Sequence, residues 1–127
     1  MTIRVILAND HQILLEALGV LLENEADIDV VGVNADGLAV HNLSATLHPD
    51  VVVMGIGKHA PDSIDATRQL TADYPEIRII ALATLPQREH AISMLDAGAS
   101  TYVIKEDHGA ELVCALHAVT EHRTCTF

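Results

Sequence analysis

Aromatic residues are almost absent from this 127-residue chain, which has no tryptophan, two tyrosines and one phenylalanine. A platform of aromatic side chains on which nucleobases stack is therefore excluded. Positive charge is also scarce: seven Lys and Arg stand against eighteen Asp and Glu, a formal net charge of −11. Such a surface repels polyphosphate backbones and anionic membranes. We therefore expect no direct nucleic-acid contact and no membrane contact by this domain.

Other signatures are missing as well. The longest nearly apolar run, Ile79 to Leu85, is far shorter than a membrane span, and no signal-type segment precedes the first strand pattern, so we expect a cytoplasmic location. Cys114 and Cys125 form neither a CxxC motif nor a disulfide framework, which predicts reduced thiols. The eight histidines lack ligand spacing, so we expect no metal site and no bound cofactor.

Aliphatic residues are what the chain has in quantity. Half of its residues are hydrophobic and only 20% are charged, which excludes intrinsic disorder and predicts a well-filled aliphatic core. The length fits one domain that buries its own core.

Short aliphatic runs alternate five times with helical periodicity. The runs predict strands over Ile3–Ala8, Ile28–Val33, Val51–Met54, Ile77–Leu82 and Thr101–Ile104. The periodic segments predict helices over His11–Asn24, Gly37–Leu47, Ser63–Asp73 with Asp62 as N-cap, Pro86–Asp96 and Gly109 to about His122. Near-continuous aliphatic strands joined by helices indicate an α/β fold, (βα)5, with a doubly wound parallel sheet covered on both faces.

In such sheets, ligands bind outside the carboxyl ends of the strands. The residues at or just beyond those ends are Asn9, Asp10, Gly55, Gly57, Ala83, Thr84 and Lys105. They are therefore the first candidates for a functional site.

Several ordered segments carry a more specific signal. They are Ile3-Arg4-Val5-Ile6-Leu7 before Asn9-Asp10-His11, His48-Pro49-Asp50 before Val51-Val52-Val53-Met54, Ile64-Asp65-Ala66-Thr67-Arg68, Ala97-Gly98-Ala99-Ser100, and Tyr102-Val103-Ile104-Lys105. Together they resemble the receiver domain of bacterial response regulators, of the NarL/FixJ type that precedes a LuxR-type helix-turn-helix. The resemblance runs from Ile3 to about Val119. It implies a flavodoxin-like fold with strand order 2-1-3-4-5, a receiver or pseudo-receiver domain over 1–120, and a tail or linker start over 121–127 leading to an output domain absent from this chain.

In receivers of this family, an acidic pair and a phosphoacceptor aspartate hold Mg²⁺, while a Ser or Thr and a Lys contact the phosphoryl oxygens. The matching positions here are Asn9 and Asp10, Gly55, Ala83 and Lys105, so only Asp10 and Lys105 keep the family's residue types. A glycine has no oxygen nucleophile, and a single carboxylate beside a lysine is a poor magnesium site. The resemblance therefore implies a degenerate phosphorylation pocket, no enzyme activity and no metal.

Alternatives remain open at this pocket. Asp10 and Lys105 form either a structural ion pair or a residual cation site. The vacated pocket is an alternative site for a small molecule or anion, and His59 is an alternative phosphoacceptor. Thr84 is an alternative source of the hydroxyl that Ala83 lacks. Tyr102 matches the family's switch aromatic, and it either switches or simply packs.

Two helices show departures that favour self-association. Leu15 and Gly19 on the first helix, and Cys114 and Ala118 on the last, put small or apolar residues where receivers of this type carry polar ones. We expect a joint patch that pairs two copies as a homodimer, with incidental exposure as the alternative. The resulting interpretation is a phosphorylation-independent regulatory and dimerisation domain of an atypical response regulator. That protein would be a transcription factor whose own helix-turn-helix domain binds DNA.

Overall fold

The computed structural model describes residues 2–9, 12–34, 37–56, 60–83, 88–104 and 109–121. In these ranges strands and helices alternate along the chain. The strands are β1 (Ile3–Ala8), β2 (Ile28–Asn34), β3 (Val51–Gly55), β4 (Arg78–Ala83) and β5 (Thr101–Ile104). The helices are α1 (Gln12–Glu23), α2 (Gly37–Leu47), α3 (Ala60–Asp73), α4 (Arg88–Ala97) and α5 (Gly109–Glu121).

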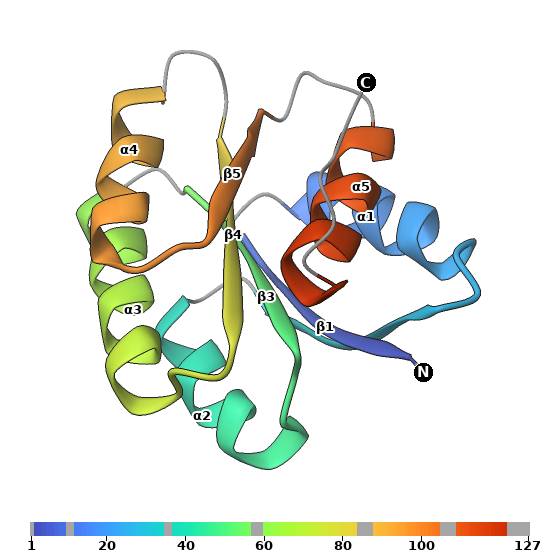
Figure 1. The fold of residues 1–127 in the computed structure, drawn as a ribbon, viewed down its shortest axis with the longest axis horizontal. Helices are drawn as coiled ribbons and strands as arrows, with labels where there is room; N and C mark the ends of the chain where they lie inside the picture. The colour runs from blue at the N-terminus through green and yellow to red at the C-terminus, as the bar shows by residue number, and fades with distance from the viewer. Residues whose placement is uncertain are drawn as a thin grey trace.

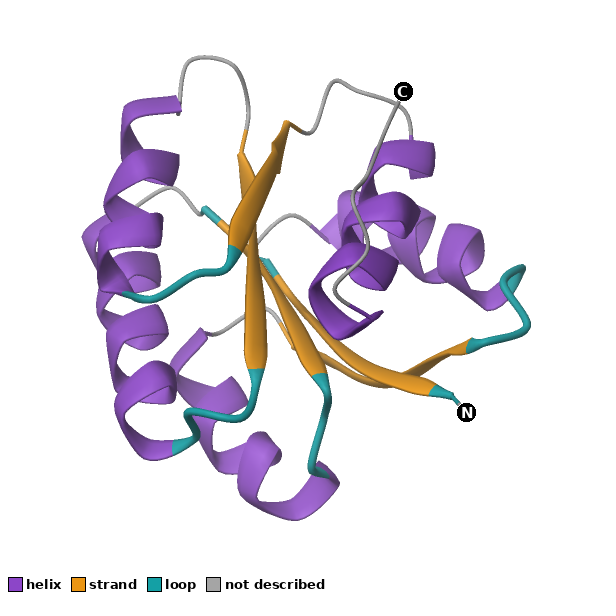
Figure 2. Ribbon diagram, in the orientation of Figure 1, coloured by secondary structure: helices purple, strands orange, loops and turns teal. Residues whose placement is uncertain are grey.

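The strands form one parallel sheet in the order β2-β1-β3-β4-β5, which confirms the predicted fold class and strand order. Helices α1 and α5 cover one face, and α2, α3 and α4 cover the other (Figure 1). Figure 2 shows the sheet as the middle of three layers. Parallel strands point their carboxyl ends to one edge, so the ends of β1, β3 and β4 meet there.

Each face of the sheet has its own aliphatic core because side chains alternate along a strand. On the α2, α3 and α4 side, Ile6, Val52 and Ile79 pack in one cluster. On the α1 and α5 side, Leu7, Val53 and Ile80 pack in a second cluster. The central strand β3 is buried along its whole length, which accounts for its run of three valines.

Helix α3 begins earlier than predicted. The structure starts it at Ala60, so Asp62 lies in its first turn rather than at the N-cap. A carboxylate in the first turn is favoured by the positive end of the helix dipole, and this explains why the residue resembles a cap in the sequence. The N-cap assignment of Asp62 is wrong.

The α2–β3 connection is held by Arg4. Its guanidinium donates a 2.6 Å hydrogen bond to the carbonyl of Leu47, the last residue of α2, and its backbone N–H donates to Asp50 Oδ2 at 2.9 Å. His48 in this connection has a φ of 50°, in the left-handed region that most residues avoid. The backbone of this turn is therefore locally strained, and the hydrogen bonds of Arg4 stabilise the turn in that conformation.

Candidate regulatory site at the carboxyl ends of the strands

Three of the predicted pocket residues lie on adjacent strands. Asn9 follows β1 directly, Gly55 is the last residue of β3, and Ala83 is the last residue of β4. β1 and β3 are paired up to Ala8 and Met54, and β3 and β4 up to Gly55 and Leu82. The fold therefore brings these three positions to one edge of the sheet.

The other predicted members of the site cannot be placed. Asp10, Thr84 and Lys105 lie outside the described residues, as do Gly57 and His59. The Asp10–Lys105 ion pair, the hydroxyl of Thr84 and the alternative acceptor His59 therefore stay predictions.

The side chain of Asn9 fills the space over Gly55. A β-carbon built on Gly55 would lie 2.9 Å from Asn9 Cβ and 2.5 Å from Asn9 Cγ, and it would also collide with Nδ2. Asn9 is only 4% exposed, so its side chain has little room to move aside. Any residue larger than glycine at position 55 requires the amide of Asn9 to leave its place.

The main chain of Gly55 is fixed as well. The hydroxyl of Ser63 in α3 donates to the carbonyl of Gly55 at 3.3 Å. The next N–H, that of Ile56, donates to Leu82 O at 2.9 Å, so the loop continues the β3–β4 ladder for one residue. Hydrogen bonds to both the C=O and the N–H of the Gly55–Ile56 peptide group hold this strand end against the neighbouring helix and strand.

The other pocket position is apolar. Ala83 is fully buried and belongs to the core cluster under α3 and α4. Its methyl group has no hydrogen-bonding capacity. Among the described pocket residues, then, Asn9 supplies an amide, Gly55 supplies only its backbone, and Ala83 supplies only apolar contact.

Tyr102 is half-buried in β5 and packs against the same cluster as Leu95 of α4. This arrangement fits the packing alternative, since a tyrosine ring buried on one side contributes apolar area to the core. Whether its ring also changes position remains a prediction.

The four predicted interface residues separate into different environments. Leu15 is 2% exposed and lies in the core under α1, so its assignment to a contact surface is wrong. Gly19 faces open space, because a β-carbon there would have no atom within 4 Å. Cys114 is half-exposed on α5, and Ala118 lines a groove between α5 and β5.

Cys114 also corrects the expected redox state. It is disulfide-bonded in the structure, so the expectation of a reduced thiol is wrong at this position. The other half of that bond lies outside the described residues. This disulfide was not predictable from the sequence, because the spacing of the cysteines matches no recognised disulfide framework.

Sequence reasoning missed the residues of α1 that do face solvent. Ile13 and Val20 are 73% and 64% exposed, seven residues apart on one side of the helix. Two turns of a helix bring positions i and i+7 onto the same face. Leu15 and Leu22, which are also seven residues apart, lie on the buried face. The seven-residue spacing groups residues by face, but it does not say which face is buried until the burial of one residue is known.

The described ranges contain neither a membrane-spanning helix nor a cluster of metal ligands. None of the described helices is long and apolar enough to cross a bilayer. In the same ranges no three His, Cys, Asp or Glu side chains are grouped so that they could ligate a metal ion. Asp10, the one carboxylate of the predicted pocket, is outside these ranges.

The sheet has the order 2-1-3-4-5 and lies between two helical layers, and polar and small residues gather at its carboxyl edge. These features define a receiver-type α/β domain. The chain belongs to the response regulator receiver domain family, whose model matches residues 5–117. It is 32% identical over 119 residues to the transcriptional regulatory protein LiaR of Bacillus subtilis, covering 94% of this chain and 56% of LiaR. It is 28% identical over 116 residues to the response regulator protein VraR of Staphylococcus aureus, covering 91% of this chain and 56% of VraR.

Solved structures agree with this assignment. A two-component response regulator of the LuxR family from Aurantimonas sp. SI85-9A1 superposes with a TM-score of 0.88 at 32% identity, covering 99% of this chain and 90% of that one. The non-phosphorylated receiver domain of RcsB from Escherichia coli gives a TM-score of 0.84 at 25% identity, covering 98% of this chain and 97% of that one. The chain spans about half the length of the curated relatives it matches.

Proposed function

We propose that this domain regulates transcription as the receiver of a LuxR-type response regulator, and that it does so without being phosphorylated. Residues 1–120 form the receiver, and 121–127 are the tail that leads toward an output domain. The proposed role in transcription is supported by the family and by relatives that are transcriptional regulators. The proposed independence from phosphorylation is supported by the filled space between Asn9 and Gly55.

The argument against phosphoryl transfer combines chemistry with sterics. Transfer needs a nucleophilic side chain, and Gly55 has no side chain. It also needs room for a phosphoryl group and its metal ion above the strand end. The buried amide of Asn9 lies directly over Gly55 and takes up part of that volume. The same observation weighs against a small molecule or anion bound directly over Gly55.

Intact-mass measurement after incubation with acetyl phosphate and Mg²⁺ tests this proposal. We expect no added phosphoryl mass on the wild-type domain. A stoichiometric adduct would overturn the proposal, and fragmentation would show whether His59 or another residue carries the group. A conventional receiver treated in parallel is the positive control for the reagent.

We further propose that the domain forms a homodimer through α1 and α5 without phosphorylation. The open surface at Gly19 and the half-exposed Cys114 support this pairing, and two-fold dimers are the commonest closed assemblies. Gly19→Arg places a long cation on that surface, so we expect it to yield monomers in sedimentation velocity. An unchanged dimer in this variant would exclude the Gly19 surface from the contact.

A further inference from the structure

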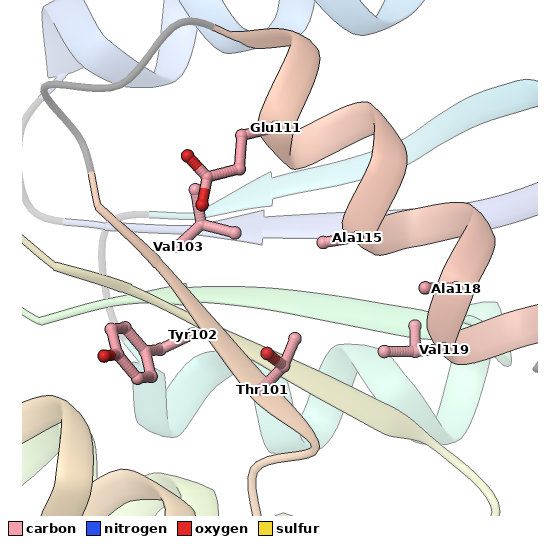
Figure 3. A pocket seen from close by; sticks show the side chains of 7 residues that line it. All are labelled: Thr101, Tyr102, Val103, Glu111, Ala115, Ala118 and Val119. Atoms are coloured by element: carbon pink, nitrogen blue, oxygen red, sulfur yellow. The ribbon is translucent and has the colours of Figure 1, made fainter. Parts of the chain in front are cut away.

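A groove of about 300 Å³ lies between the last strand and the last helix. One wall is β5, from which Thr101 and Val103 point toward α5 (Figure 3). The other wall is α5, which contributes Glu111, Ala118 and Val119. The groove is separate from the Gly55 region, because none of the described residues that line it belongs to β1, β3 or β4.

The strand in this groove is at the edge of the sheet. In the described chain, β5 is the last strand in the order and pairs with β4 on one side. Three of its four residues are half-buried, whereas every residue of central β3 is buried. An edge strand presents backbone N–H and C=O groups that a further strand can use.

The groove also reaches around that edge. Tyr102 belongs to its lining, yet its ring lies on the opposite side of β5 from Thr101 and Val103, as the alternation of a strand requires (Figure 3). Tyr102 therefore lines the groove where the groove touches β5, and its ring does not occupy the space beneath α5.

Small side chains on α5 keep the groove open. Ala115 and Ala118 lie opposite the strand at positions where a leucine would fill the space (Figure 3). Val103 and Val119 add apolar side chains to the two walls. Glu111 places a carboxylate over the Val103 end, and it is the only acidic side chain among the described residues of the lining.

We propose that this groove binds an extended peptide of a partner protein, which adds to the free edge of β5 as a further strand. Main-chain hydrogen bonds to the edge strand would supply affinity, and alternate side chains would enter the space beneath α5. The four residues of β5 span about 13 Å at roughly 3.3 Å per residue, so four or five residues of the peptide would pair.

The chemistry of the walls specifies the peptide. Beneath Ala118 and Val119 the space suits small apolar side chains such as alanine or valine. At the Val103 end, Glu111 favours a lysine or arginine. Acidic residues outnumber basic ones eighteen to seven in this chain, and the net charge of −11 favours a cationic peptide as the occupant of this groove.

The test begins with a phage-displayed library of random heptapeptides selected on the wild-type domain. Bound phage are then counted on Ala118→Leu, which fills the groove, and on Glu111→Gln, which removes its carboxylate. Matched controls on α1 are Ala17→Leu and Glu16→Gln, which make the same chemical changes at other exposed positions. Circular dichroism melts establish that all four variants fold.

We expect enriched peptides to alternate small apolar residues and to carry a basic residue at one end. A synthetic copy should shift amide resonances of Thr101 to Ile104 in NMR spectra. Ala118→Leu should weaken binding by at least about tenfold, because the leucine occupies the space that a side chain of the peptide would enter. Glu111→Gln should weaken it about two- to fivefold, as a partly exposed ion pair would. Both α1 controls should bind as the wild type does.

A second peptide separates strand addition from simple attraction between opposite charges. Methylation of its backbone nitrogens removes ladder hydrogen bonds and leaves every side chain in place, so we expect binding to be lost. Equal binding of the methylated peptide would overturn the proposal, as would a selection that enriches nothing specific to the wild-type groove. Conversion of a dimer to a monomer by Ala118→Leu in sedimentation velocity would assign the groove to a second copy and also overturn it. None of these results depends on phosphoryl transfer at position 55.

Discussion

The amide of Asn9 lies over the α-carbon of Gly55, in the volume that any side chain at position 55 would enter. This relationship makes two neighbouring strand ends depend on each other. Substitution at either position changes the space available to the other.

Gly55→Ala should therefore destabilise the domain by about 1–3 kcal/mol, the usual range for overpacking a core site. Asn9→Ala in the same chain should recover most of that loss, because it removes Cγ and Nδ2, the two closest atoms. Urea unfolding of the two single variants and the double variant measures this coupling. Additive free energies would show that the two side chains do not compete for space.

Gly19→Ala is the matched control for that substitution. A β-carbon at Gly19 meets nothing within 4 Å, and the residue lies in the interior of α1. Alanine in a helix interior is favoured over glycine by about 0.5–1 kcal/mol, so this variant should be stabilised. The two glycine-to-alanine changes should move the urea midpoint in opposite directions.

Leu15 and Ile13 provide a comparison along α1. Leu15→Ala should cost about 2–5 kcal/mol because it empties a buried site. Ile13→Ala removes an exposed side chain and should change the free energy of unfolding by no more than about 0.5 kcal/mol. Comparable losses from both variants would mean that Ile13 is covered in solution, for example by a second copy.

The strands and the orientation of α1 show where prediction from the sequence succeeds and where it fails. The strands were predictable because β3 and its neighbours are aliphatic runs that only a sheet covered on both faces can bury. The orientation of α1 was not, since apolar residues occupy most of its circumference and leave the buried face ambiguous. The prediction that Leu15 lies on a contact surface is wrong for that reason.

The candidate site shows a similar division. The positions of Asn9, Gly55 and Ala83 followed from strand ends and family resemblance, and the structure brings them to one edge. The filled space over Gly55 did not follow, because it depends on the side-chain conformation of Asn9 and on the spacing of β1 and β3. The groove at β5 is not predictable from the sequence, because alanines on a helix do not reveal what they face.

His48 should respond to replacement in a way that its exposure alone does not suggest. Its φ of 50° suits glycine, so His48→Gly should stabilise the domain by up to about 1 kcal/mol. His48→Val should destabilise it, because a β-branched side chain is disfavoured in the left-handed region. Thermal unfolding of the two variants tests whether the strain is present in solution.

His117 of α5 and Asp27 in the α1–β2 turn are joined by a 2.6 Å contact between Nε2 and Oδ2. Their side chains are 20% and 45% exposed, against 63% and 61% for the pair of Arg68 and Asp65. A double-mutant cycle should give a coupling near the upper end of about 0.2–1 kcal/mol for the first pair and near the lower end for the second. Equal couplings would show that the His117 contact does not tie α5 to the turn.

The last prediction concerns repair of the predicted phosphorylation pocket. Gly55→Asp alone should not create a response to Mg²⁺, because the new carboxylate competes with the amide of Asn9 for space and Ala83 offers no hydroxyl. Asn9→Asp, Gly55→Asp and Ala83→Thr together supply the carboxylates and the hydroxyl that the family uses. Repulsion between carboxylates should destabilise the metal-free triple variant, and Mg²⁺ should relieve that repulsion.

Urea melts with and without Mg²⁺ measure this directly. At a free Mg²⁺ concentration one hundred times the dissociation constant, a single site that binds only the folded state adds about 2.7 kcal/mol of stability. We expect a gain of this kind in the triple variant, together with a response to beryllofluoride, and little change in the wild type or in Gly55→Asp. If Gly55→Asp alone responds as fully as the triple variant, then the side chain of Asn9 moves aside readily, and loss of the acceptor is the only functional departure at this edge of the sheet.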